Sequence, residues 1–167
     1  MPSDLNCKLW PNDQEHYFVD RVFQPRRQTG PHCVSTALAV LTGATPESFQ
    51  GVINTQDPVS WSDALRPVGV KLAYCPHDVR KLGFYLAELI ALDDLFLLSY
   101  YSPSGTEMLQ EPDGQGWVCQ SHVVLLHRDW IIDTMLGVAL PVCEHPCEDH
   151  HTKRIFRVLP VGHPRGL

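Results

Sequence analysis

A cysteine, a histidine and an aspartate lie far apart in this sequence, but together they could perform nucleophilic catalysis. Cys33 stands where a helix is expected to begin. The positive end of a helix dipole and its free N–H groups favour the thiolate, which is the nucleophilic form of cysteine. His122 opens one apolar run and Asp133 closes the next. A carboxylate bonded to His122 would fix its tautomer and support its charged form beside a thiolate.

The positions of His122 and Asp133 suit two neighbouring strands. Short apolar runs over 122–126 and 130–134 flank the turn-like residues 127–129, which indicates a β-hairpin. Side chains alternate along a strand, so a four-residue loop places His122 and Asp133 opposite or diagonal to each other on one face. Such neighbours have Cβ atoms about 5–8 Å apart, within reach of an imidazole–carboxylate hydrogen bond.

Gln28 is the fourth candidate for the same site. It stands five residues before Cys33, on the segment that leads into the helix. Its amide N–H₂ could join the backbone N–H of Cys33 in holding an oxyanion.

Each of these residues also has an ordinary structural interpretation. A cysteine on a helix of small residues is usually buried, a strand histidine usually packs in or beside the core, and an aspartate at a strand end usually belongs to a turn. His127 and Asp129 form a competing pair, but both fall in the expected turn. The combination of the four candidates in this order is what predicts a catalytic site.

A second cluster lies near the carboxyl end. Cys143, His145, Cys147 and His150 have a spacing that zinc ligands can use. All four ligands would come from one short segment, and no second Cys or His pair lies elsewhere at finger spacing. We therefore expect a polar loop and assign no metal or other cofactor, while metal binding by these residues stays open.

The helix that carries Cys33 is the clearest expected element. Residues 33–41 form a run of small and apolar side chains that should end at Gly43. Residues 78–90 are ambiguous, with a helical turn broken at Gly83. Capping residues with a nearby proline or acid indicate two more helix starts, at 45–47 and at 60–63.

Strands dominate the second half of the sequence. Apolar and alternating runs predict strands over 95–101, 122–126, 130–134, 138–142 and 155–159. A loop over 103–116, rich in proline and glycine, is expected to be mobile and to border the cleft. Helices followed by an antiparallel sheet give an α+β fold.

The 167 residues suit one domain of ordinary globular composition, with 44% hydrophobic and 19% charged residues. We expect residues 1–25 to form an arm packed on the body and residues 26–167 to form a single domain. The formal net charge of −6 argues against nucleic acid or an anionic membrane as a partner. No apolar run approaches the roughly 18 residues of a membrane span.

The amino end lacks the positive and apolar regions of a signal peptide, which predicts a cytoplasmic chain. Export that needs no signal peptide stays open. The six cysteines are accordingly expected to be free thiols.

These motifs resemble a known family. Gln28-x₄-Cys33 at a helix start, His122-Val-Val and Ile-Ile-Asp133 are similar to the papain-like cysteine peptidases, and most similar to the bacterial branch that cleaves bacteriocin leader peptides after a double glycine. The resemblance covers roughly residues 24–140. It implies a papain-like fold with Cys33 as nucleophile, His122 as general base, Asp133 as its orienting partner and Gln28 in the oxyanion hole.

The sequence departs from the family at three neighbouring positions. Val34 follows the cysteine where the family usually has glycine, Val123 follows the histidine where an aromatic residue is common, and Thr134 follows the aspartate where proline is common.

The expected function is a cysteine hydrolase that cleaves a peptide or amide bond through a thioester on Cys33. Its expected partner is a protein or peptide substrate, and the oligomeric state stays open. A glutamine deamidase or acyltransferase on the same fold is the alternative within enzymes. A binding module without turnover, or a metal-binding regulator built on residues 143–151, are alternatives of other classes.

Overall fold

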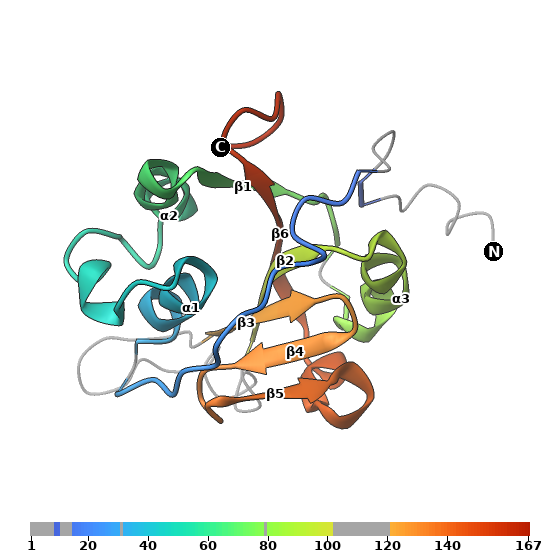
Figure 1. Ribbon diagram of the computed structural model, residues 1–167. Coiled ribbons are helices and arrows are strands. Elements are labelled where there is room, and N and C mark those ends of the chain that lie inside the picture. The colour runs from blue at the N-terminus through green and yellow to red at the C-terminus, as the bar shows by residue number, and fades with distance from the viewer. Residues whose placement is uncertain (1–8, 11–14, 31, 79, 102–120) are drawn as a thin grey trace.

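A computed structural model describes residues 9–10, 15–30, 32–78, 80–101 and 121–167. The loop predicted over 103–116 lies outside the described residues. At the centre is an antiparallel sheet whose strand order is β1-β6-β2-β3-β4-β5 (Figure 1). Its strands are β1 Val70–Tyr74, β2 Leu95–Tyr101, β3 Ser121–His127, β4 Trp130–Asp133, β5 Val138–Pro141 and β6 Thr152–Pro160.

Helices cover both faces of this sheet, which confirms the α+β class. The α-helices are α1 Cys33–Thr42, α2 Pro58–Leu65 and α3 Gly83–Leu92. Short 3₁₀ helices follow them or connect strands: η2 Pro46–Ser48, η3 Arg66–Val68, η4 Val142–Glu144 and η5 Pro146–Asp149. In Figure 1, α1 and α2 lie on one side of the sheet and α3 lies on the other.

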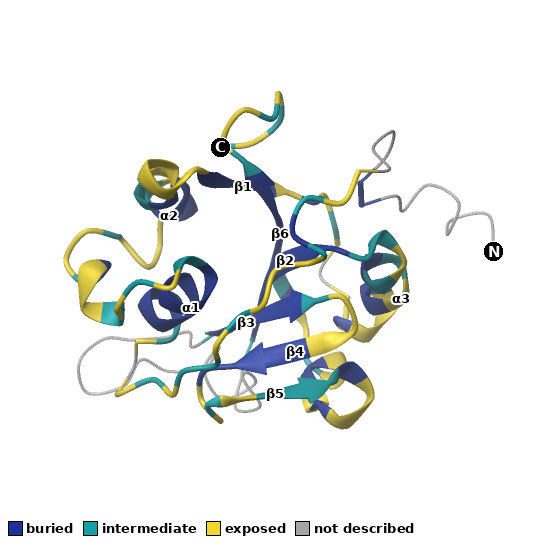
Figure 2. Ribbon diagram, in the orientation of Figure 1, coloured by how far each residue is buried: buried dark blue, intermediate teal, exposed yellow. Residues whose placement is uncertain are grey.

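Two apolar clusters, one on each face, hold these layers together. Along β3, Val123 and Leu125 join the cluster beneath α1 and α2, whereas Val124 and Leu126 join the cluster beneath α3. All four side chains are at most 1% exposed. A strand buried on both faces needs a continuous apolar run, which is the pattern of β2 and β3 (Figure 2).

The helix predicted over 33–41 is confirmed as α1. It ends at Gly43, which has φ +79° and whose N–H donates to the carbonyl of Ala39. Glycine adopts this left-handed conformation without the clash of a Cβ atom, so it stops the helix there.

Two other helix expectations were wrong in detail. The capping signal placed at Ser60 lies inside α2, which begins at Pro58 because the Asp57 side chain accepts the Val59 N–H at 3.1 Å. The helix expected from Thr45 is only the three-residue η2. Strand β1, which lies between α2 and α3 in the sequence, was not predicted.

Gly83 begins α3, although the sequence analysis placed a break there. The reason is a close approach from another part of the chain. A Cβ atom at this position would meet the backbone oxygen of Glu148, in η5, at 3.0 Å. The glycine therefore allows α3 and η5 to touch.

The hairpin of β3 and β4 turns more tightly than expected. His127 pairs with Trp130, so Arg128 and Asp129 alone connect the strands, in place of a four-residue loop. Arg128 takes up the positive φ of +61° that this short turn requires.

The amino-terminal arm is fastened to the sheet by a buried carboxylate. Asp94 accepts the backbone N–H groups of Tyr17 and Phe18 at 2.9 and 2.8 Å. It also forms an ion pair with Arg157 at 2.8 Å, and both of these charged side chains are fully buried. No helix within the described residues is long and apolar enough to cross a membrane.

Candidate active site

Cys33 and His122 meet where α1 packs against β3. Cys33 is the first residue of α1 and is partly exposed, while His122 is the second residue of β3 and is 6% exposed. The Cys33 side chain lies close enough to the His122 imidazole to help raise its pKa. Figure 1 shows α1 beside the end of the sheet where β3 begins and β4 ends.

Asp133 completes a chain of three side chains. It is the last residue of β4 and is 5% exposed. Val124 pairs with Asp133, so His122 is its diagonal neighbour two residues along β3. This geometry places Oδ1 of Asp133 2.6 Å from Nε2 of His122.

The electrostatics of this chain favour a charged imidazole. Burial alone would lower the pKa of His122, but hydrogen bonds to Asp133 and Cys33, with the charges of both groups, raise it to about 9. Burial would raise the pKa of Asp133, but hydrogen bonds from His122, His145 and the Met135 N–H hold it well below its usual range. The arrangement can therefore supply an imidazolium and a carboxylate beside a thiol.

Gln28 has partners other than Cys33. Its Nε2 donates to the carbonyl of Gly30 at 3.0 Å, and its Oε1 accepts the hydroxyl of Thr134 at 2.8 Å. Its backbone N–H also donates to the Thr134 carbonyl at 2.7 Å. Gln28 is thus tied to the residue that follows Asp133, and its amide would have to leave Gly30 to serve an oxyanion.

His145 is a member of the site that the sequence analysis assigned elsewhere, to the possible zinc cluster. It is 3% exposed, and its Nε2 lies 2.8 Å from Oδ2 of Asp133. No local pattern could have placed it there, because the contact depends on how the segment after β5 folds back against β4.

Tyr100 is a second neighbour that the sequence analysis did not identify. It pairs with His122 across β2 and β3, and their rings meet edge to face with centroids 5.8 Å apart. The His150 ring stacks on it at 5.0 Å. Burial, with the charges of Asp133, Cys147 and Cys33, raises the pKa of Tyr100, so its hydroxyl stays protonated.

The cluster after β5 does not assemble into a metal centre in the described part of the chain. Cys147 is fully buried, and burial raises the pKa of its thiol to about 12. Cys143 is exposed, and His145 is turned toward Asp133. Among the described residues, no group of three His, Cys, Asp or Glu side chains is placed to hold a metal ion.

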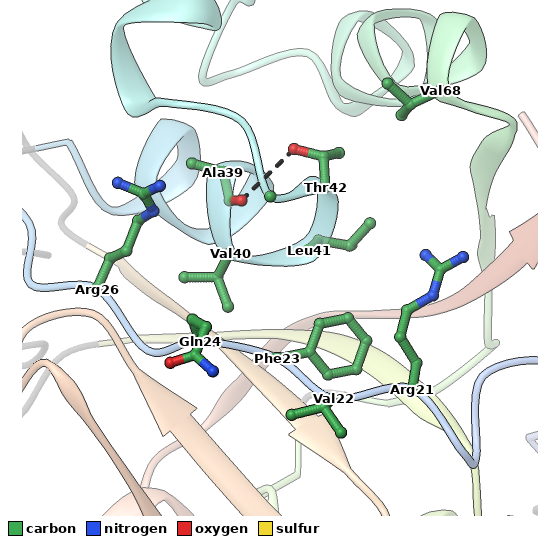
Figure 3. A pocket seen from close by; sticks show the side chains of 11 residues that line it. Arg21, Val22, Phe23, Gln24, Arg26, Ala39, Val40, Leu41, Thr42 and Val68 are labelled. Atoms are coloured by element: carbon green, nitrogen blue, oxygen red, sulfur yellow. Dashed lines mark hydrogen bonds between the residues drawn. The ribbon is translucent and has the colours of Figure 1, made fainter.

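A cavity of about 420 Å³ lies away from this chemistry, at the other end of α1. Figure 3 shows residues from the segment before α1, such as Arg21 and Arg26, on one side and the last turn of α1, with Thr42, on the other. At 1.5 Å per residue, α1 separates its two ends by about 14 Å. We therefore do not assign this cavity to the Cys33 site.

The site thus consists of Cys33, His122 and Asp133 in contact, with Gln28 tied to Thr134 beside them and His145 behind the carboxylate. Comparison of the chain with protein-family models, with curated proteins and with solved structures found no match.

Proposed function

We propose that this protein is a cysteine hydrolase that cleaves a peptide or amide bond through a thioester on Cys33. The observation that supports the proposal is the placement of Cys33 beside His122 and of His122 2.6 Å from Asp133, with the pKa of His122 raised to about 9. A histidine that is charged at neutral pH stabilises a neighbouring thiolate and can protonate a leaving amine.

The proposed reaction needs only these groups and water. The Cys33 thiolate attacks the substrate carbonyl carbon. The backbone N–H of Cys33 holds the oxyanion, together with the Gln28 amide once that amide has left the Gly30 carbonyl. His122 gives its proton to the leaving amine as the carbon–nitrogen bond breaks, which leaves a thioester. Water then adds to the thioester with its proton passing to His122, and the acid departs as the thiolate re-forms.

A papain-like fold is the finer proposal for the architecture. Two features support it: the nucleophile at the first residue of α1, and the histidine and aspartate on adjacent antiparallel strands. A protein or peptide is accordingly the proposed substrate.

A peptide-library digest followed by mass spectrometry tests the reaction, with the Cys33→Ala chain as control. New peptide termini that depend on Cys33 support a peptidase. A gain of about 1 Da on glutamine without cleavage corrects the proposal to a deamidase, because only the leaving group differs. No Cys33-dependent change in any peptide overturns it.

Alkylation supplies an independent test with an internal control. Cys33 is partly exposed and Cys143 is exposed, whereas Cys75 and Cys147 are buried thiols. Near neutral pH, iodoacetamide should label Cys33 at least tenfold faster than Cys143, and His122→Ala should remove that advantage. Equal labelling of the two residues would count against an activated thiolate.

A further inference from the structure

His145 is held in one tautomer by its neighbours. It lies between η4 and η5, and its Nδ1 accepts the backbone N–H of Cys147 at 3.1 Å. Because Nδ1 is an acceptor, Nε2 carries the ring proton. That N–H donates to Oδ2 of Asp133 at 2.8 Å.

Both oxygens of the Asp133 carboxylate are consequently occupied. Oδ1 accepts from Nε2 of His122 at 2.6 Å and from the Met135 N–H at 2.8 Å, while Oδ2 accepts from His145. The terminal torsion of an aspartate is otherwise broad, so donors on both oxygens determine the plane of the carboxylate. A rotation that released Oδ2 would also turn Oδ1 away from His122.

We infer that His145 is a positioning residue, which holds the Asp133 carboxylate in the orientation that bonds His122. The inference rests on the proposed function, since it assigns a role within that site. His145 acts through Asp133 and touches no reacting atom. Partners in the outer shell of a site often orient the groups that act directly in this way.

The groups that face His122 come from four elements. Cys33 belongs to α1, Asp133 to β4, Tyr100 to β2, and His150 follows η5. Asp133 is the one among them that His145 contacts by a hydrogen bond. An effect of His145 on His122 is therefore expected to pass through this carboxylate.

Two substitutions separate positioning from a merely structural role, since His145 also caps η5. In His145→Asn the short side-chain oxygen can accept the Cys147 N–H, as capping asparagines do, but the side chain is too short to reach Asp133. In His145→Gln the longer amide can donate to Asp133, but the cap is lost. Each variant thus keeps one of the two contacts.

Positioning predicts that His145→Asn lowers kcat by about 10- to 100-fold with little change in KM, while His145→Gln keeps most of the activity. In the Asn variant, the loss of kcat at alkaline pH should begin at lower pH. The inference is overturned if His145→Asn resembles the wild type, or if both variants lose activity only in proportion to the loss of folded protein.

The role of His145 can also be tested without catalysis, by a titration, so that its failure is distinguishable from failure of the proposed function. The His122 imidazole is followed by NMR in Cys33→Ala chains with and without His145→Asn. Positioning predicts that His122 titrates at lower pH when Asn is present, and identical titrations overturn the inference. Absence of hydrolysis and of selective labelling in the wild type would instead overturn the proposed function.

Discussion

At the residue scale, the pKa of His122 is determined by opposing effects of different size. Burial disfavours its charge, but the hydrogen bonds and negative charges of Asp133 and Cys33 outweigh burial and raise the pKa to about 9. The pKa of Asp133 is instead lowered, because hydrogen bonds from His122, His145 and the Met135 N–H stabilise its ionised form. Folding therefore makes His122 bind its proton more tightly, and Asp133 bind its proton less tightly, than in the unfolded chain.

This difference predicts a pH dependence of stability. His122 has a higher pKa folded than unfolded, so its contribution is fully present below about pH 6.5 and is lost as the pH rises through about 9. The contribution is on the order of 3 kcal/mol, at about 1.4 kcal/mol per pKa unit. Urea unfolding of the wild type and of His122→Gln should therefore give free energies that differ more at pH 6.5 than at pH 9.5. A difference that does not change with pH would contradict the assignment.

At the element scale, the contact between α3 and η5 determines where the segment after β5 lies. Gly83 provides the space for Glu148, and η5 begins next to His145. The side chain of His145 then reaches Asp133 at the end of β4. A small residue in one helix thus helps to place a side chain of the candidate site.

A Gly83→Ala substitution tests this packing. An added Cβ would lie 3.0 Å from the Glu148 carbonyl oxygen and 3.1 Å from its Cβ, so backbone must shift to admit it. The nearest atom is backbone of η5, which must move by a few tenths of an ångström. We therefore expect a loss of about 1 kcal/mol, more than the helix propensity gained at a terminal position. Chemical denaturation should show this loss. Gly162→Ala, with nothing within 4 Å of the added Cβ, is the control expected to change stability little.

The elements that the sequence predicted well are those determined by local signals. Gly43 stops α1 through its own backbone conformation, and alternation along the hairpin places His122 and Asp133 on one face even though the turn is shorter than expected. The contacts of His145 and Gln28 depend on packing between distant segments, so no local pattern predicted them. Gly83 was predicted to break a helix for the same reason: the space that it provides is for Glu148 of η5, a distant segment, and not for its own helix.

At the scale of the whole molecule, a buried ion pair joins residues 15–30 to the sheet. Asp94, directly before β2, binds Arg157 of β6 and the backbone of Tyr17 and Phe18. The chain then continues beyond the arm to Gln28, whose backbone N–H donates to the carbonyl of Thr134 beside the candidate site. Asp94 and Arg157 are both fully buried, so removing either one leaves the other as a charge that water cannot reach.

Asp94→Ala should therefore destabilise the protein by about 3–5 kcal/mol, as breaking a buried pair typically does. Asp63→Ala, which removes an exposed ion pair with Arg66, is the matched control and should change stability by less than about 1 kcal/mol. Urea denaturation measures both. If the arm is held as described, trypsin should also cleave after Arg21 faster in Asp94→Ala under native conditions. If Asp94→Ala and Asp63→Ala lost the same free energy of unfolding, burial would not be what makes the Asp94–Arg157 pair important.

The place of β6 in the sheet has a consequence for how the protein is made. This strand, residues 152–160, is the last in the chain, yet it lies between β1 and β2 near the middle of the sheet. All other strands of the sheet are therefore translated before the strand that pairs with both β1 and β2. The pairing that joins β1 to the rest of the sheet can therefore form only after residues 152–160 have been made, and a chain that stops before Thr152 would lack it.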